Sequence, residues 1–347
     1  MILLEKAYNY NWIYDSHYRL FCIHNCCQLL MQYYGVKNRE LYLNCIWDCR
    51  VKFDDALIYG FVITNNNLPL LEEYSSWYQI TFHDDYERTW SANCDVIKQG
   101  IPVIIAVDRY YLPYAADYGN RHGAHAVLLI GYDNIKTASI IDCHPDGIYK
   151  GLVSYEDLCK ARLSDNAWNG YINSGQALKS ASLVLNPEIP DGTVIQAICS
   201  LSTLHEQYFS NTQPGHGQKG LQNALITILT NRTDVSYEDF FQYLYGQLFP
   251  LIQKKVLFDY YLEHASIYGH EFFRQARQLL APIIYDWKNS LQIIMRLAYS
   301  MKQDKIRLNE ELVQSIELAF HHENVFGNYI KEVIHELRLQ EGQSCCE

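Results

Sequence analysis

Hydrophobic patterning changes character near residue 190. Before that point, stretches with helical spacing alternate with short apolar runs rich in β-branched residues, whereas later apolar residues recur at three- and four-residue intervals. The connecting segment NPEIPDG, at 186–192, holds two prolines and a glycine, which is typical of a link between domains. The pattern therefore predicts an α+β domain over 1–190 and a helical domain over 191–347.

The first part contains one well-marked helix and a set of strands. A helix is expected from about Cys22 to Tyr34, ending at Gly35, and shorter helical stretches are expected at 39–49 and 94–99. Ser154 followed by Asp157 indicates a capping box that opens a further helix at 155–162. Strands are expected at 101–107, 125–133, 137–143 and 180–186. The second and third of these are separated by three residues, which predicts a hairpin.

Strand signals disappear from the second part. Helical periodicity covers 193–210, 216–231, 236–265, 269–303 and 308–339. Helices in this number, joined by short connections, predict an α-helical bundle.

Composition limits the classes of function. The chain has 347 residues, 49% of them apolar, which is enough for two real cores. A formal net charge of −11 argues against nucleic-acid binding and suits a cationic small molecule. The longest apolar runs fall far short of the ~20 residues that span a bilayer, so no membrane association is expected. The opening MILLEKAYNYNW lacks a signal-peptide pattern, and the expected location is cytoplasmic.

Cysteine is the most informative residue type. There are 11, an odd number, and several lie in apolar periodic stretches, as expected for reduced thiols. Cys22 stands where a polar loop gives way to the first helix. The helix dipole and free N–H groups at such a position favour a reactive thiolate. The alternative is a buried structural cysteine, which is how we interpret Cys26 and Cys27.

A base and an orienting carboxylate are expected on the central hairpin. His125 begins a strong strand after a glycine-containing loop, where a fixed backbone can present an imidazole as a general base. Asp142 lies on the next strand and could hold the second ring nitrogen. The alternatives are a hydrogen-bonded core histidine and an aspartate that caps the following turn. The order Cys, His, Asp and these placements match the papain arrangement.

Four ordered motifs resemble those of the butirosin biosynthesis protein H N-terminal family, which is similar in fold to papain and the C39 peptidases. They are CIHNCCQLLMQYYG at 22–35, GIPVIIAVDRYYLPY at 100–114, HGAHAVLLIGYD at 122–133 and IIDCHPDG at 140–147. The resemblance spans roughly residues 10–190. It implies a papain-like cysteine protease fold in the N-terminal half, followed by an α-helical bundle, with Cys22, His125 and Asp142 as the catalytic triad.

The same resemblance implies a reaction. It indicates acyl or peptidyl transfer from a carrier-protein thioester, through a Cys22 thioester, to an amine in natural-product (antibiotic) biosynthesis. No cofactor is expected beyond the phosphopantetheinyl group of the carrier. The expected partners are an acyl or peptidyl carrier protein and a small amine such as a diamine, polyamine or aminoglycoside. Asp108 is expected to be a structural or substrate-facing carboxylate, and with Tyr114 it is a candidate for substrate binding.

The oxyanion donors are the part of the site that departs from papain. No glutamine shortly precedes Cys22, so Asn11 or Ser16 is expected to act beside the Cys22 backbone N–H.

Three other functions remain open on sequence alone. A cysteine peptidase or amide hydrolase would use the same triad with water as the acceptor. A non-catalytic binding protein could share the fold. A metal site could draw on His122, His125, Cys143 or His144, although these residues lack a compact ligand spacing.

Overall fold

The computed structural model describes residues 2–13, 22–54, 59–64, 70, 72–81, 85–133, 137–144, 147–165, 180–230, 237–299 and 305–344. The chain forms two compact units. The first consists of Met1–Asn44 and Asn67–Gly192, and the second of Cys45–Asn66 and Thr193–Glu347. The sequence interpretation assigns Cys45–Asn66 to the first domain, whereas in the structure this segment packs with the helices that follow Gly192.

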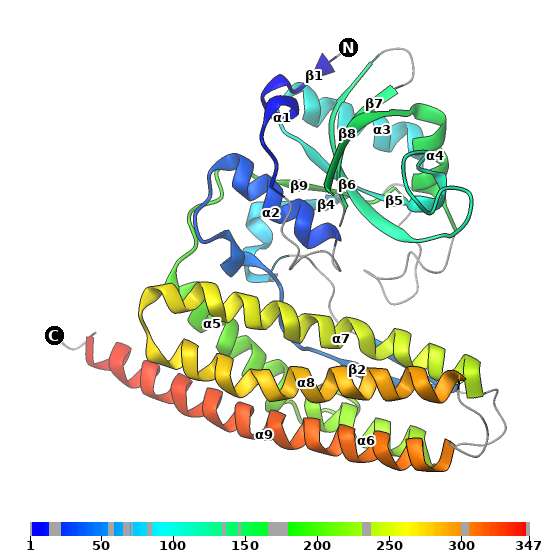
Figure 1. Ribbon diagram of the computed structural model, residues 1–347. Helices are drawn as coiled ribbons and strands as arrows, with labels where there is room; N and C mark the ends of the chain where they lie inside the picture. Colours follow the sequence, from blue (N-terminus) through cyan, green and yellow to red (C-terminus); the bar gives the residue numbers. More distant parts are fainter. Residues whose placement is uncertain are drawn as a thin grey trace. The chain divides into compact units, whose positions relative to one another are not determined.

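An antiparallel sheet organises the first unit (Figure 1). Its strands follow the order β4-β9-β5-β6-β7-β8, and β1 pairs with the far end of β6. The strands are β1 (Ile2–Leu3), β4 (Tyr78–Thr81), β5 (Val103–Asp108), β6 (Ala124–Tyr132), β7 (Thr137–His144), β8 (Gly147–Ser154) and β9 (Ser182–Leu185). Mixed helices and antiparallel strands confirm the α+β class. The expected strands correspond to β5, β6, β7 and β9, and β6 and β7 pair as the predicted hairpin.

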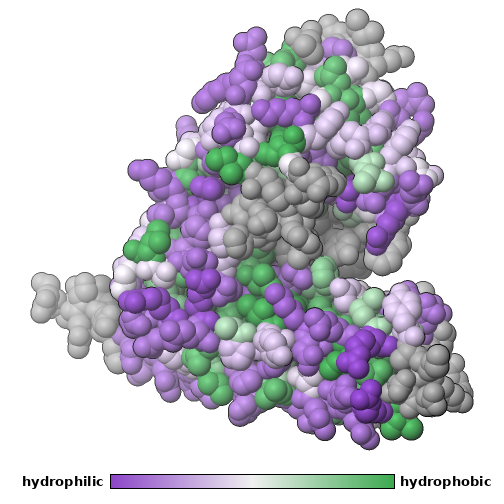
Figure 2. All heavy atoms as spheres, viewed as in Figure 1, coloured by the Kyte–Doolittle hydropathy of each residue, from purple (hydrophilic) through white to green (hydrophobic). Residues whose placement is uncertain are grey.

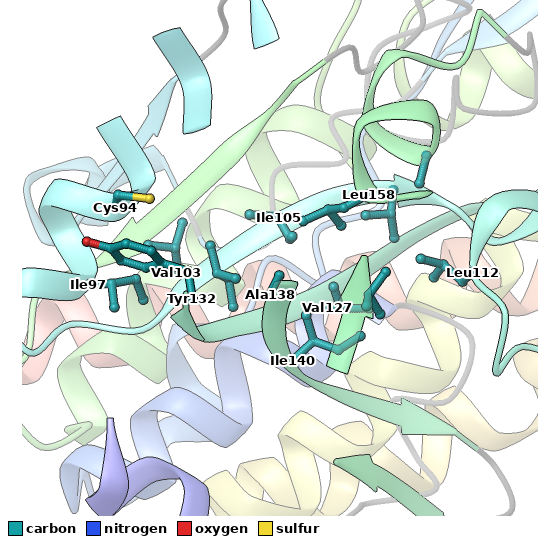
Figure 3. Close-up of a cluster of buried hydrophobic side chains, with 14 of the residues drawn as sticks. Cys94, Ile97, Val103, Ile105, Leu112, Val127, Tyr132, Ala138, Ile140 and Leu158 are labelled. Carbon is teal, nitrogen blue, oxygen red and sulfur yellow. The ribbon is translucent and has the colours of Figure 1, made fainter. Parts of the chain in front are cut away.

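Helices cover this sheet. They are α1 (Glu5–Asn9), α2 (Cys22–Tyr34), α3 (Tyr86–Lys98) and α4 (Tyr155–Leu163), with 3-10 turns η2 (Arg39–Tyr42), η3 (Glu72–Trp77) and η4 (Arg109–Tyr111). The predicted cap of α4 is present, because the Ser154 side chain accepts a hydrogen bond from the Asp157 N–H. Apolar side chains of β5, β6 and β7 pack with α3 and α4 into one core, in which Ile105, Val127 and Ile140 are almost fully buried (Figure 3).

The helix expected at 39–49 is wrong beyond its first turn. Only Arg39–Tyr42 is helical, and the chain then runs extended through Leu43. Every residue from 41 to 47 is buried. An amphipathic helix would leave one face of this segment in water, so burial on all sides overrides the local periodicity.

The second unit is mainly helical. Its helices are α5 (Val194–Leu204), α6 (Gly217–Thr230), α7 (Tyr237–Ala265), α8 (Glu271–Tyr299) and α9 (Lys305–Ser344), with the π-helical turn η6 (His205–Phe209) and the 3-10 turn η7 (Ser266–Tyr268). Each lies within or close to a predicted helix. The segment from the first half adds a two-stranded hairpin, β2 (Arg50–Phe53) and β3 (Phe61–Thr64), which the sequence did not predict.

The surface is mostly polar on the face shown in Figure 2, with apolar side chains interspersed. Among the helices in the described part of the chain, none combines the length and the apolar character that crossing a membrane requires.

Candidate active site

Cys22 is the first residue of α2 and is partly exposed. Every residue from 24 to 31 of this helix is buried, which fixes its orientation in the first unit. Cys26, one turn further on, is almost fully buried, and its Sγ lies 3.4 Å from the Ala126 carbonyl oxygen. Burial raises the pKa of Cys26, as it does that of fully buried Cys27. The geometry therefore places one accessible thiol at the helix start and two buried, protonated thiols behind it.

His125 and Asp142 meet on the central strands. His125 is the second residue of β6 and pairs with Val107 of β5, while Asp142 lies on β7. The imidazole Nε2 is 2.6 Å from Asp142 Oδ1, and the two side chains are 10% and 2% exposed. A hydrogen bond this short, in a buried setting, is charge-assisted when the ring is protonated.

The electrostatics of His125 favour the imidazolium. Burial lowers its pKa, but the charge and hydrogen bond of Asp142, and an interaction with the Cys22 side chain, outweigh burial and raise it to about 10. The three predicted triad residues are thus brought together, with the imidazole between the thiol and the carboxylate.

Tyr114 contacts the carboxylate rather than open solvent. Its hydroxyl donates to Asp142 Oδ2 over 2.9 Å. The ring stacks on Tyr149 of β8, with centroids 3.8 Å apart and planes within 6°. The sequence interpretation assigned Tyr114 to substrate binding. In the structure, its hydroxyl donates to the Asp142 carboxylate.

Asp108 accepts hydrogen bonds from both ends of the β5–β6 connection, which contains Tyr114. Its Oδ1 accepts from the N–H groups of Tyr110 and Gly123, at 3.1 and 3.0 Å. Its Oδ2 receives the Ser164 hydroxyl at 2.6 Å and lies 2.8 Å from His122 Nδ1. Burial opposes ionisation, yet these hydrogen bonds prevail and hold the pKa of Asp108 below its usual value.

Of the two expected roles of Asp108, its surroundings favour the structural role over substrate binding. The side chain is fully buried, and both oxygens are engaged by groups of the protein. A carboxylate satisfied in this way has no surface for an incoming ammonium. Its position instead keeps the two ends of the β5–β6 connection together.

The oxyanion candidates are less defined. Asn11 is exposed beyond the end of α1, and Ser16 lies outside the described residues.

His122, a candidate for the alternative metal site, stacks on Tyr110, with ring centroids 4.1 Å apart, and faces Asp108. Within the described ranges, no three or more His, Cys, Asp or Glu side chains gather as metal ligands would.

Two neighbours of the site escaped sequence reasoning. Tyr149 lies directly opposite Asp142 in the β7–β8 ladder, on a strand whose alternation is too polar to stand out. Cys143 is buried close enough to Cys22 and Asp142 for both to raise its pKa, although burial is the larger cause. The one available sequence signal is the alternation of β7, since successive side chains of a strand point to opposite faces of the sheet. It indicates that Cys143 and Asp142 point to opposite faces.

The fold and site define an α+β unit in which a thiol at a helix start, an imidazole and a carboxylate converge. The family model for butirosin biosynthesis protein H, N-terminal, matches residues 69–143. The match includes His125 and Asp142 and lies beyond Cys22. It confirms, over these residues, the family resemblance inferred from the motifs. No curated protein matches the chain.

Proposed function

We propose that this protein is an amide-forming acyltransferase that works through a Cys22 thioester. The observation that carries the proposal is the 2.6 Å contact between His125 Nε2 and Asp142 Oδ1, with the Cys22 side chain among the groups that interact with the imidazole. A raised His125 pKa favours the imidazolium, which is the partner that a thiolate nucleophile requires. Helix start, strand start and adjacent strand occur in the papain order, and we extend the proposal to a papain-like fold.

The chemistry proceeds in two balanced steps. The Cys22 thiolate attacks the carbonyl carbon of a carrier-bound thioester, the carbon–sulfur bond to the carrier breaks, and His125 gives its proton to the departing thiolate. A neutral amine then attacks the acyl-enzyme. The carbon–nitrogen bond forms, the bond to Cys22 breaks, and His125 takes the proton from the amine nitrogen. The thiolate–imidazolium pair is restored.

Thioester exchange suits the first step because one thioester replaces another at little energetic cost. The name of the matched family refers to the biosynthesis of butirosin. By that analogy, the proposed setting is natural-product biosynthesis, with an acyl or peptidyl carrier protein as donor and a small amine as acceptor. The Cys22 backbone N–H, at the positive end of α2, is the proposed oxyanion donor, with Asn11 as a second candidate.

Intact-mass analysis tests the nucleophile. The protein is mixed with an acylated carrier protein or with an acyl thioester of N-acetylcysteamine, and the mass is followed before any amine is added. The wild type and the Cys26→Ala variant are expected to gain one acyl group, whereas Cys22→Ala gains none. An acyl group mapped to the Cys26 peptide would contradict the assignment.

The acceptor is tested separately. We propose an amine with a second positive charge, supported by the net charge of −11. The acyl-enzyme is offered a diamine, the matching monoamine or water, at moderate and at high salt. The expected result is amide formation that is faster with the diamine and loses this preference in high salt. Release of free acid at the same rate with and without amine would identify a hydrolase instead.

A further inference from the structure

The two oxygens of Asp142 are held from different sides. Oδ1 faces His125 Nε2 at 2.6 Å, and Oδ2 accepts the Tyr114 hydroxyl at 2.9 Å. The terminal torsion of an aspartate is broad, so a single hydrogen bond would leave the carboxylate plane free to swing. A second donor on the other oxygen fixes the plane and, through it, the direction of the imidazole.

The donor itself is locked by a ring. Tyr149 is directly opposite Asp142 in the β7–β8 ladder, so both side chains leave the same face of the sheet. Tyr114 stacks on Tyr149 at a centroid distance of 3.8 Å. Its own backbone belongs to the connection that Asp108 closes. Burial, and next the charge of Asp142, raise the pKa of Tyr114, so its hydroxyl keeps its proton over the working range of the enzyme.

We infer that Tyr114 is a positioning residue that holds the Asp142 carboxylate toward His125, with Tyr149 as the platform that fixes its ring. This inference rests on the proposed thiol chemistry of Cys22. It replaces the expectation that Tyr114 binds substrate, because the Tyr114 hydroxyl donates to the Asp142 carboxylate.

A double-mutant cycle distinguishes these two roles. The variants are Tyr114→Phe, Asp142→Asn and their combination, and the matched control is Tyr149→Phe, which deletes a hydroxyl from the same ring stack. The measured quantity is the rate of iodoacetamide alkylation at the Cys22 peptide. This rate depends on the thiolate–imidazolium pair and requires neither carrier protein nor amine.

A positioning role gives a specific pattern of rates. Tyr114→Phe is expected to lower the rate about 10-fold, the scale of one hydrogen bond to a charged group. In the Asp142→Asn background the same substitution should change the rate less than about 2-fold, since the residue through which Tyr114 acts is already altered. Tyr149→Phe should stay within about 2-fold of wild type, because the stacked ring remains.

A spectroscopic readout separates positioning from general stability. The strongly hydrogen-bonded Nε2 proton of His125 should resonate well downfield of the amide protons, be absent in Asp142→Asn, and shift or broaden in Tyr114→Phe but not in Tyr149→Phe. If Tyr114→Phe does not fold, Tyr149→Leu is used instead, because it removes the ring on which Tyr114 stacks and keeps the Tyr114 hydroxyl. It should then show a loss of about 5-fold that vanishes in the Asp142→Asn background.

Two results would overturn the inference. One is an unchanged rate and an unchanged resonance in Tyr114→Phe. The other is a loss of equal size in the presence and absence of Asp142, which would return Tyr114 to substrate contact. Failure of the proposed function is recognised separately, by an acyl adduct that still forms in Cys22→Ala.

Discussion

Two buried charge pairs, one in each unit, serve different ends. In the second unit, Lys255 Nζ lies 2.9 Å from Glu323 Oε1, and both side chains are almost fully buried. The ammonium sits 3.9 Å from the ring centroid of Trp47 and 4.7 Å from that of Tyr208. Tyr208 and Trp287 each donate to Glu323 over 2.7 Å. Aromatic rings and their donors thus enclose this pair.

The His125–Asp142 pair has similar components, but one of its members contacts a partly exposed side chain. It too has a buried carboxylate and an aromatic hydroxyl that donates to it. Its cationic member, however, contacts the partly exposed thiol of Cys22. Charge, burial and aromatic partners are therefore common to both pairs. What marks a candidate site is the accessible nucleophile at one end.

The pKa shifts of the two cations also differ in direction. The partners of His125 raise its pKa to about 10 in spite of burial. For Lys255, burial lowers the pKa, and Glu323 only partly restores it. A proton on His125 therefore stabilises the folded state, whereas keeping the buried Lys255 charged costs free energy that Glu323 offsets only in part.

The largest expected effect distinguishes the pairs by chemistry. His125→Ala should lower the rate of Cys22 acylation by about 10²–10⁴-fold, the usual contribution of a positioned acid–base group. Lys255→Met is the matched control, because it also removes a buried cation, and its rate per folded molecule should equal that of wild type. The rates are measured by intact mass over time. Equal losses in the two variants would contradict a specific role of His125 in the reaction of Cys22.

The next effect distinguishes the pairs by stability. Glu323→Ala leaves the Lys255 ammonium buried without its partner and should lower the free energy of unfolding by about 3–5 kcal/mol. The double variant Lys255→Met/Glu323→Gln removes both charges at similar volume, keeps an acceptor oxygen for the buried Tyr208 and Trp287 donors, and should lose less. Urea denaturation at neutral pH measures both. A double variant no more stable than Glu323→Ala would show that the aromatic packing, rather than the charge, was disturbed.

A third effect follows from the sign of the His125 shift. Because the folded pKa is raised from 6.5 to about 10, the stability that it contributes is fully present below about pH 6.5 and is lost as the pH rises through 10. Its size is on the order of a few kcal/mol. Asp142→Asn should remove most of this pH dependence. Unfolding free energies at several values between pH 6 and 10 test the prediction, and parallel curves for the two proteins would contradict it.

The smallest effect concerns Asp108, a buried carboxylate whose two oxygens accept hydrogen bonds from groups of the protein. Asp108→Asn should lower the free energy of unfolding by about 1–3 kcal/mol at neutral pH, because buried donors lose a charged acceptor. The folded pKa of Asp108 is lowered, so the difference from wild type should shrink as the pH falls below about 4. Thermal unfolding in acidic and neutral buffers measures it. A difference independent of pH would mean that the lost hydrogen bonds do not depend on ionisation.

Local sequence signals predicted much of the fold. Cys22–Tyr34 ends at Gly35, which has φ of +82°, and Ser154 caps α4 as its spacing with Asp157 indicates. β6 and β7 are apolar enough to be recognised without any neighbour. In each of these cases the physical cause lies within a few residues of the element that it shapes.

The remainder depends on distant partners. β2 and β3 form a hairpin in the second unit, and β4 owes its strand state to pairing with β9, about a hundred positions later. The same limit applies to the candidate site. The types and order of Cys22, His125 and Asp142 could be predicted, but the contact of Tyr114 could not, because nothing local tells whether a tyrosine faces substrate or a carboxylate.

The assignment of Cys45–Asn66 to the second unit has a consequence for synthesis of the chain. Trp47 stacks with Phe326, with ring centroids 5.4 Å apart, and also contacts Phe258. A ribosome adding about 5–20 residues per second reaches Phe326 roughly 15–55 s after Trp47. During that interval the segment Cys45–Asn66 lacks its packing partners, whereas β6 and β7, which carry His125 and Asp142, can already pair. A chain stopped at Gly192 would keep Trp47 and Phe61 without the aromatic rings that contact them, so the unit that holds the candidate site cannot be separated by a single cut at Gly192.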